Sequence, residues 1–462
     1  MPRPAARVSA VFFAAIALLL GAGTPAGATG SAFEWPQLQG GNARTGSNSV
    51  QTALTATTAP SLHLAWSFNT ASSVSGEPVA ANGLVYFGAR DGNLRAVDRS
   101  GNLIWSTFVG MTSAPCNGAT VNQGIGGSPA LTLGPPSLVY VGGGDGWLYA
   151  LDALTGSIVW KTQLAVPPAG FLWSSPAVFG GSVYEGVASL DDCPLVRGAL
   201  ARLDASTGAV QNVRWIAPQA CLGATIWASP AIDEARGIVY VATGNAGPCP
   251  QPEIGSTAII ALRASDLGVL GYWQVPGGAL PNSDSDFGAT PTLFSAVING
   301  QPRDLIGVAN KNGVYYVLDR TNLPAGPVWQ ETIALSGEDP TAGQGSISAS
   351  AFDGTSLYIG GGGLPVKGSF CGGTLRAVDP ATGQVRWYVC APAPILAPVS
   401  ATPGLVVVSA AGGLAVLTSD TARLLFIYRN TRGGVFWGGT AISEGVLYAG
   451  STDGYLYAFA PA

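Results

Sequence analysis

A hairpin-like unit recurs along the chain and constrains the fold more than any other feature. Its clearest copy, residues 145–160 (DGWLYALDALTGSIVW), begins with the alternation of a β-strand, continues through an Asp-Ala-Leu-Thr-Gly turn, and returns as a second strand. Related copies occupy residues 91–105, 197–215, 255–273, 311–329, 372–387 and 411–428, and a half copy occupies residues 453–462.

Each hairpin is preceded by another pair of short apolar strands, as in residues 126–146 and 228–245. The repeat therefore contains four strands and extends over roughly 40 to 50 residues. A four-stranded antiparallel sheet of this size cannot bury both of its faces alone, so the sheets are expected to pack radially as the blades of a β-propeller.

The aromatic residues that close the hairpins give the number of blades. Seven copies end in such a residue: Trp105, Trp160, Trp215, Trp273, Trp329, Trp387 and Tyr428. The eighth copy lacks its closing strand, but residues 62–70 (LHLAWSFNT) have the pattern of one. The sequence thus predicts an all-β fold over residues 62–462: an eight-bladed β-propeller of four-stranded antiparallel blades, closed by the N-terminal strand completing the last blade.

The N-terminal region has the basic, apolar and small-residue segments of a secretory signal peptide, in that order. Arg3 and Arg7 precede an apolar run over residues 8–20, and small residues follow up to Ala28. The alternative is a membrane anchor, but this run is shorter than the roughly 20 residues that a spanning helix needs. We therefore expect a signal peptide over residues 1–28, cleaved after Ala28, an N-terminal extension over residues 29–61, and a secreted or extracytoplasmic protein with no later transmembrane segment.

Composition excludes several classes of partner and of site. Only 10% of the residues are charged, and 21 Lys and Arg against 26 Asp and Glu give a net charge of −5 with no basic run, so no nucleic-acid partner is expected. The single histidine, His63, lies far in sequence from the candidate site residues and argues against His-based catalytic triads and His-ligated metals.

The cysteines predict disulfide bonds. The chain has six, with no Cys-X-X-Cys pair, which fits structural disulfides in an exported protein. If the four strands of each blade run outward from the axis, all six cysteines lie on the face that carries the loops between blades and those between the second and third strands. We expect Cys371 to pair with Cys390 within one blade, Cys193 to pair with Cys221 in the same way, and Cys116 to pair with Cys249.

The repeats, together with residues 34–46 (EWPQLQGGNARTG) leading into LAWSFNT, resemble the pyrroloquinoline quinone (PQQ)-repeat β-propeller family. Within it, the chain resembles the quinoprotein alcohol dehydrogenases. The resemblance implies an eight-bladed propeller that binds PQQ and a Ca²⁺ or lanthanide ion.

Three segments imply residues that contact the cofactor. Residues 307–322 (GVANKNGVYYVLDRTN) are similar to the family segment whose basic residue reaches the quinone oxygens, which assigns that catalytic and binding role to Lys311. Residues 223–227 (GATIW) resemble the segment whose tryptophan lies flat under the cofactor, here Trp227. The Val-Arg-Gly segment around Arg197 adds that arginine to the implied cofactor-binding residues.

Two further segments imply the metal site and the base. Residues 239–245 (VYVATGN) match the segment whose asparagine ligates the metal, here Asn245. Residues 282–288 (NSDSDFG) resemble the acidic motif, in which Asp284 is the implied general base and Asp286 an added ligand, with both carboxylates close to the metal.

The sequence also departs from the family. Cys193 stands where the family has a metal-binding glutamate, and Asp191 and Asp192 are the nearby substitutes. The vicinal cysteine pair is reduced to Cys116 alone. Two hypotheses therefore remain: an exported dehydrogenase acting on an alcohol or sugar with PQQ and Ca²⁺ or a lanthanide, and a non-catalytic propeller that binds a protein or polysaccharide at the cell surface.

Overall fold

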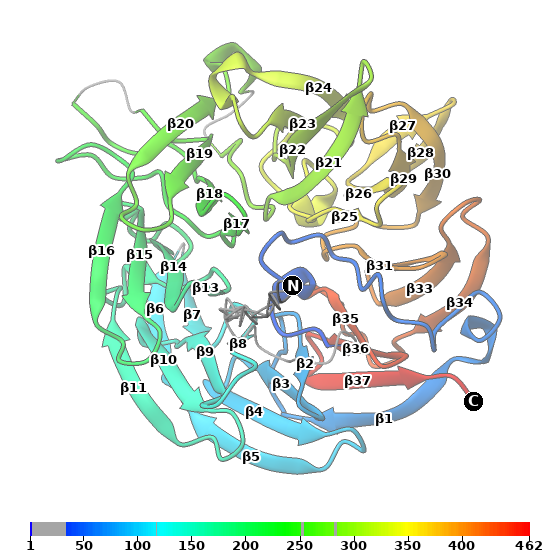
Figure 1. Ribbon diagram of the computed structural model, residues 1–462, viewed down its shortest axis with the longest axis horizontal. Helices are drawn as coiled ribbons and strands as arrows, with labels where there is room; N and C mark the ends of the chain where they lie inside the picture. Colours follow the sequence, from blue (N-terminus) through cyan, green and yellow to red (C-terminus); the bar gives the residue numbers. More distant parts are fainter. Residues whose placement is uncertain (2–33, 117, 251–253, 281–283) are drawn as a thin grey trace.

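The computed structural model describes residues 1, 34–116, 118–250, 254–280 and 284–462, so the expected signal peptide lies outside the described residues apart from Met1. Eight four-stranded antiparallel sheets are arranged in a ring, with the first strand of each sheet near the centre (Figure 1). The predicted eight-bladed β-propeller is confirmed.

The first four blades follow one another along the chain. From the innermost strand outward they are β2 (Val79–Ala81), β3 (Leu84–Gly88), β4 (Asn93–Asp98) and β5 (Leu103–Phe108); β8 (Ala130–Leu131), β9 (Leu138–Gly142), β10 (Trp147–Asp152) and β11 (Ile158–Gln163); β13 (Ala177–Phe179), β14 (Ser182–Ser189), β15 (Ala199–Asp204) and β16 (Val210–Trp215); β17 (Ala231–Asp233), β18 (Ile238–Ala242), β19 (Ala258–Arg263) and β20 (Val269–Gln274).

The last four blades complete the ring. They are β21 (Thr292–Ile298), β22 (Gln301–Ala309), β23 (Val314–Asp319) and β24 (Pro327–Thr332); β25 (Ala351–Phe352), β26 (Leu357–Gly361), β29 (Gly373–Val378) and β30 (Val385–Ala391); β31 (Ser400–Thr402), β32 (Leu405–Ala410), β33 (Gly413–Thr418) and β34 (Leu424–Arg429); β35 (Thr440–Ser443), β36 (Val446–Gly450), β37 (Tyr455–Ala460) and β1 (His63–Asn69).

A few short elements lie outside this pattern. They are the hairpins β6–β7 (Thr112–Cys116 and Ala119–Gln123) and β27–β28 (Leu364–Val366 and Ser369–Cys371), strand β12 (Gly170–Phe171), and the 3₁₀ turns η1 (Leu38–Gly40), η2 (Ala59–Ser61), η3 (Gly277–Ala279), η4 (Leu323–Ala325) and η5 (Pro340–Ala342). None of the helical turns in the described part of the chain has the length and hydropathy of a membrane span.

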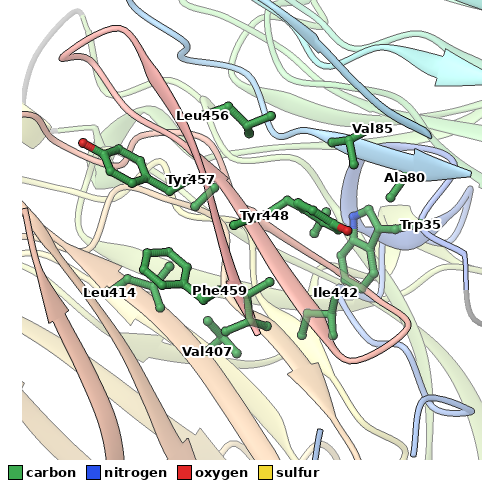
Figure 2. Packing of buried hydrophobic residues seen from close by; sticks show 14 of the residues in the cluster. Trp35, Ala80, Val85, Val407, Leu414, Ile442, Tyr448, Leu456, Tyr457 and Phe459 are labelled. Carbon is green, nitrogen blue, oxygen red and sulfur yellow. The ribbon is translucent and has the colours of Figure 1, made fainter. Parts of the chain in front are cut away.

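The ring closes as the sequence predicts. Strand β1 pairs with β37, with Ser67 opposite Tyr457, and so supplies the outer strand of the eighth blade. The apolar cluster at this junction includes Trp35, Val407, Ile442, Tyr448 and Phe459, which come from the N-terminal segment and from blades 7 and 8 (Figure 2). Burial of these large side chains favours the closed ring over an open one.

Three of the seven closing aromatics, Trp215, Trp273 and Tyr428, are not in the register that the repeat suggests. Trp160 lies opposite Ala150, and its indole Nε1 donates to the carbonyl of Ala205 in the next blade at 3.0 Å. In blade 3 the residue equivalent to Ala150 is Arg202, which lies opposite Asn212, so Trp215 lies three residues later and is 47% exposed. The equivalent position is Gly271 in blade 4 and Phe426 in blade 7, so Trp273 and Tyr428 each lie two residues later.

Residues 35–48, which we call the axial belt, contact all eight blades. Hydrogen bonds join the belt to the innermost strand of each blade: Trp35 to Ala80, Pro36 to Leu131, Asn42 to Val178 and Ile232, Ala43 to Leu293, Thr45 to Phe352, Gly46 to Ala401, and Asn48 to Ile442. Each innermost strand follows the loop that connects its blade to the preceding one. Because the belt bonds to these strands, it lies deeper in the central channel than the connecting loops.

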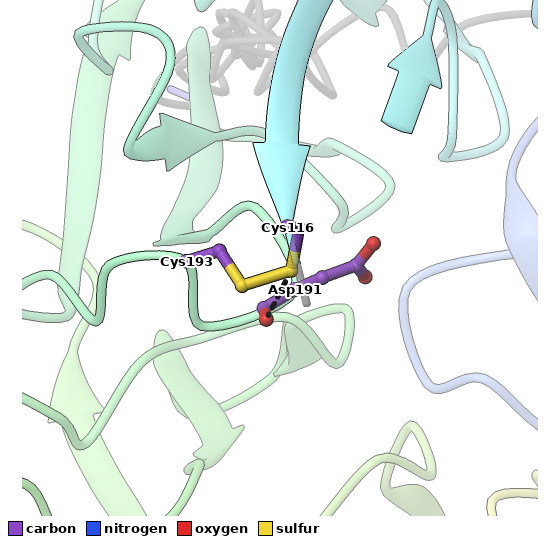
Figure 3. The surroundings of a disulfide bond; sticks show 3 residues. All are labelled: Cys116, Asp191 and Cys193. Atoms are coloured by element: carbon purple, nitrogen blue, oxygen red, sulfur yellow. Dashed lines mark hydrogen bonds between the residues drawn. A yellow bond between two sulfur atoms is a disulfide. The ribbon is translucent and has the colours of Figure 1, made fainter. Parts of the chain in front are cut away.

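All three disulfides lie on the face formed by these connections and by the loops between second and third strands, which we call the loop face. The predicted bond between Cys371 and Cys390 is present, with 5.2 Å between the Cα atoms. The other two predicted pairings are wrong, because the bonds are Cys116–Cys193 and Cys221–Cys249. The first bond joins the β6–β7 hairpin, between blades 1 and 2 in sequence, to blade 3 (Figure 3), and the second joins the connection between blades 3 and 4 to blade 4.

Candidate functional site

A pocket of about 360 Å³ opens on the loop face over blades 3, 4 and 5. This volume lies within the range of about 300 to 1,000 Å³ that is common for small-molecule sites. The residues that line it are Trp173, Ala188, Ser189, Asp191, Asp192, Thr225, Trp227, Asn245, Asp284, Asp286 and Lys311. The structure thus brings together five of the six residues that sequence motifs assigned to a cofactor or metal.

Trp227 is held at its indole nitrogen. It lies in the connection from β16 to β17, and its Nε1 donates to Asp286 Oδ2 at 2.9 Å. Its ring packs on Gly288, where a Cβ atom would collide with it. One aspartate therefore fixes the position of the tryptophan at the edge, and a glycine makes room for its ring.

Lys311 lies in the loop between β22 and β23 and connects the two aspartates. Its Nζ is 2.9 Å from Asp284 Oδ1, 2.8 Å from Asp286 Oδ1 and 4.9 Å from the centre of the Trp227 ring. Burial opposes the charged form of Lys311, but the carboxylates of Asp286 and Asp284 outweigh this effect and raise the pKa of Lys311.

Asp286 is buried, and burial raises the pKa of its carboxyl group although Lys311 and the hydrogen bond from Trp227 oppose this shift. The side chain of Asp284 is about one third exposed, at 34%. The two aspartates of the acidic motif therefore lie in different environments, one fixed inside the wall and the other facing the opening.

The opposite wall of the pocket comes from the loop between β14 and β15. Asp192 Oδ2 accepts a hydrogen bond of 3.4 Å from Asn245 Nδ2, which joins this loop to that between β18 and β19. Burial raises the pKa of Asp191, the positive charge of Arg90 lowers it, and Asp192 raises it further. The substitutes for the absent family glutamate thus do line the pocket.

Arg197 does not line the pocket, unlike the other residues implied by the family motifs. Its guanidinium lies over the ring of Trp215, with 5.2 Å from Cζ to the ring centre, and its Nε donates to the carbonyl of Ala217 at 2.7 Å. These contacts hold Arg197 against the outer strand of its own blade.

Trp173 also lines the pocket, from the connection into blade 3, although none of the family motifs indicated it. Its Nε1 donates to the carbonyl of Ser189 at 2.9 Å. The repeat could have indicated this residue. Residues 172–177 (LWSSPA) align with residues 226–231 (IWASPA), so Trp173 is the repeat equivalent of Trp227.

The donor atoms that line the pocket are of the type that binds a hard cation. Asp191, Asp192, Asp284, Asp286 and Asn245 offer carboxylate and amide oxygens, which Ca²⁺ and lanthanide ions prefer. Four aspartates against one lysine also give the lining a formal charge of −3. In the described part of the chain, however, no three acidic, His or Cys side chains are already grouped closely enough to hold a metal.

The structure is thus a β-propeller with an acidic pocket on its loop face. The family model described as "Glucose/ethanol/alcohol dehydrogenase, beta-propeller domain" matches residues 202–334, and the model described as "Outer membrane protein assembly factor BamB" matches residues 23–123, 118–266 and 302–462. The chain belongs to the PQQ-repeat β-propeller family, as the sequence motifs predict.

Relatives within this family include enzymes. The quinohemoprotein alcohol dehydrogenase of Comamonas testosteroni is 31% identical over 304 residues, which cover 56% of this chain and 41% of that enzyme. The chain thus matches about two fifths of the length of this relative.

Solved structures show the same fold at lower identity. The crystal structure of the Comamonas testosteroni enzyme superposes with a TM-score of 0.74 at 21% identity and covers 92% of this chain and 80% of that one. BamB from Moraxella catarrhalis gives 0.56 at 16% identity and covers 86% and 97%. Enzymes and a protein named as an assembly factor therefore share this fold.

Proposed function

We propose that this protein is a quinoprotein-type dehydrogenase that oxidises an alcohol or a sugar with PQQ and a Ca²⁺ or lanthanide ion. The observation that supports this most strongly is the convergence of Trp227, Lys311, Asp284 and Asp286 on one pocket, although they come from three separate segments of the chain. The structural scaffold alone would not require these four side chains to meet.

Each side chain has a role in this proposal. When bound, PQQ supplies a two-electron acceptor. Trp227 offers a flat face for a planar ring, and Lys311 offers a buried positive charge beside it. Asp284, the more exposed aspartate, accepts the proton of the substrate hydroxyl group at a carboxylate oxygen. Asp286 holds Trp227 and Lys311 in place and, with Asn245, would supply oxygen ligands to the metal.

The charge of the lining makes the cation essential in this proposal. PQQ carries carboxylate groups, and a pocket with a formal charge of −3 repels such an anion. A divalent or trivalent cation that binds the aspartates removes this repulsion. We therefore expect PQQ to bind only in the presence of metal and more tightly with La³⁺ than with Ca²⁺.

The proposed location is extracytoplasmic. All six cysteines form disulfides, and such bonds persist in oxidising compartments.

The deciding experiment is a titration of the purified protein with PQQ, alone and with Ca²⁺ or La³⁺, followed by tryptophan fluorescence and cofactor absorbance. We expect metal-dependent quenching, alcohol-dependent dye reduction by the loaded protein, and loss of binding in Lys311→Ala and Asn245→Ala. Lys161→Ala, a change at an exposed lysine of β11, is the matched control and should bind as the wild type does.

The second candidate function is a non-catalytic propeller that binds a protein or polysaccharide. The feature that favours it is Cys193, which occupies the place of the family glutamate and is committed to a disulfide with Cys116. Absence of PQQ binding at micromolar cofactor with either metal would make this candidate the better account.

A further inference from the structure

The β6–β7 hairpin is an insertion between blades 1 and 2 that attaches to the pocket wall. Cys116 at the end of β6 is bonded to Cys193 in the loop between β14 and β15, 77 residues later (Figure 3). Next to this bond, Ala114 and Val121 of the hairpin pack with Phe171, Leu190 and Trp173 in a small cluster separate from the blade cores. The hairpin is therefore fixed to the β14–β15 loop, which forms this wall of the pocket, by a covalent bond and by apolar packing.

The two residues before Cys193 are Asp191 and Asp192, which line the pocket. Both have left-handed backbone conformations, with φ angles of 48° and 54°. Residues other than glycine adopt this region at a cost, so the surrounding contacts must hold the loop in it. Those contacts are the buried side chain of Leu190 and the disulfide, whose Cys116 Sγ lies 3.5 Å from the carbonyl oxygen of Asp191.

The charges in the pocket are divided unequally between its walls. Lys311 is paired with Asp284 and Asp286. By contrast, no ion pair within the described ranges includes Asp191 or Asp192, and the nearest polar partner of Asp192 is the neutral amide of Asn245. The wall attached to the hairpin therefore contributes two carboxylates without a cation in direct contact.

We infer that the Cys116–Cys193 disulfide positions Asp191 and Asp192 to supply the cation affinity of the pocket in place of the absent family glutamate. The inference rests on the proposed cation-dependent function and extends it to a positioning role for one disulfide. Breaking this bond frees the loop to leave its left-handed conformation, so cation affinity falls while the blades stay folded.

The test is a Tb³⁺ titration of the whole protein without PQQ, because Tb³⁺ replaces Ca²⁺ or La³⁺ at oxygen ligands and emits when a nearby tryptophan transfers energy to it. Trp173 and Trp227 both line the pocket. We expect Cys116→Ser/Cys193→Ser to bind Tb³⁺ at least about tenfold more weakly, as is common when residues that orient metal ligands are removed. Asp191→Asn/Asp192→Asn, which keeps the disulfide, should weaken binding at least as much.

The matched control is Cys371→Ser/Cys390→Ser, which removes another loop-face disulfide, in blade 6, and should leave Tb³⁺ affinity unchanged. Wild-type affinity in either the Cys116→Ser/Cys193→Ser or the Asp191→Asn/Asp192→Asn protein, with its β-sheet circular dichroism intact, would overturn the inference and leave the proposed function standing. A wild-type protein that binds neither Tb³⁺ nor PQQ with metal would instead contradict the proposed function itself.

Discussion

Glu77 is a buried carboxyl group in the connection into blade 1. Its Oε1 accepts hydrogen bonds from Trp35 Nε1 at 2.6 Å and from the backbone nitrogen of Gln39 at 2.7 Å. Burial raises its pKa to about 7, although these hydrogen bonds and the charge of Arg44 oppose the shift. The folded state thus binds this proton more tightly than the unfolded chain does.

Because the pKa of Glu77 is raised on folding, its stabilising contribution is complete below the unfolded value and is lost as pH rises through about 7. We expect the urea midpoint of the wild type to fall between about pH 5 and pH 8. Glu77→Gln keeps an accepting oxygen and cannot ionise, so its midpoint should fall less over this interval. If the urea midpoints of the two proteins fall in parallel with pH, Glu77 is not the group that causes the loss of stability.

Some residues of the candidate site could be predicted from the sequence and others could not. Lys311 and Trp227 were predictable because each lies in a segment that resembles a cofactor-binding segment of the family. The pairings of Cys116 and Cys193 were not, because Cys116 lies in an inserted hairpin whose direction no repeat pattern specifies. Arg197 has the sequence context of a cofactor ligand, but the displaced Trp215 offers its guanidinium an aromatic face nearby.

The tryptophans of two outer strands differ in burial and in their contacts with the next blade. Trp160 of β11 is buried, bonds to the next blade, and packs on Gly208, where a Cβ atom would come within 2.5 Å of its ring. Trp215 of β16 is largely exposed and contacts Arg197. Only the first of these two residues joins neighbouring blades through its indole ring.

We expect Trp160→Ala to lower the free energy of unfolding by about 3 kcal/mol or more, as is typical when a buried tryptophan is removed. Trp215→Ala should cost less than about 1 kcal/mol, close to the value of one exposed cation–π contact. Urea denaturation of the two variants would measure both values. Equal losses would mean that the register shift in blade 3 has no effect on packing between blades.

The number and type of the strands were predictable, because seven full copies and one half copy of the repeat specify the alternation and the turns. Their exact register was not. Both Trp215 and Trp273 close an outer strand as the repeat requires, yet the residues in the position of Trp160 are Asn212 and Gly271. The shift of two residues for Trp273 preserves the side of the sheet on which the side chain lies, so the alternation of the sequence does not reveal it, whereas the shift of three residues for Trp215 places that side chain on the other side.

At the scale of the whole molecule, the axial belt connects blades that are not neighbours in sequence. Its Arg44 is fully buried and donates to the carbonyl oxygens of Leu38, Pro176 and Pro230. Burial lowers the pKa of Arg44 to about 10, while the nearby charges of Glu77 and Glu185 oppose this shift. One side chain thus links the belt to the loops that lead into blades 3 and 4.

We expect Arg44→Ala to destabilise the protein by about 3 kcal/mol or more, because it leaves three buried carbonyl groups without their donor. Arg214→Ala, at an exposed arginine of β16, is the control and should stay within about 0.5 kcal/mol of the wild type. Chemical denaturation followed by both fluorescence and circular dichroism would provide these values. Similar stability of the two variants would contradict a central role for the belt.

The pairing of β1 with β37 also sets the order in which the molecule can assemble. β1 and β37 lie at opposite ends of the propeller sequence, so seven blades can form while β1 still has no partner. Contacts between residues so distant in sequence form slowly, and an unpaired strand with alternating apolar side chains is prone to associate with other chains in the meantime. Completion of the ring should therefore be the last step of folding and the one most exposed to competition from association between chains.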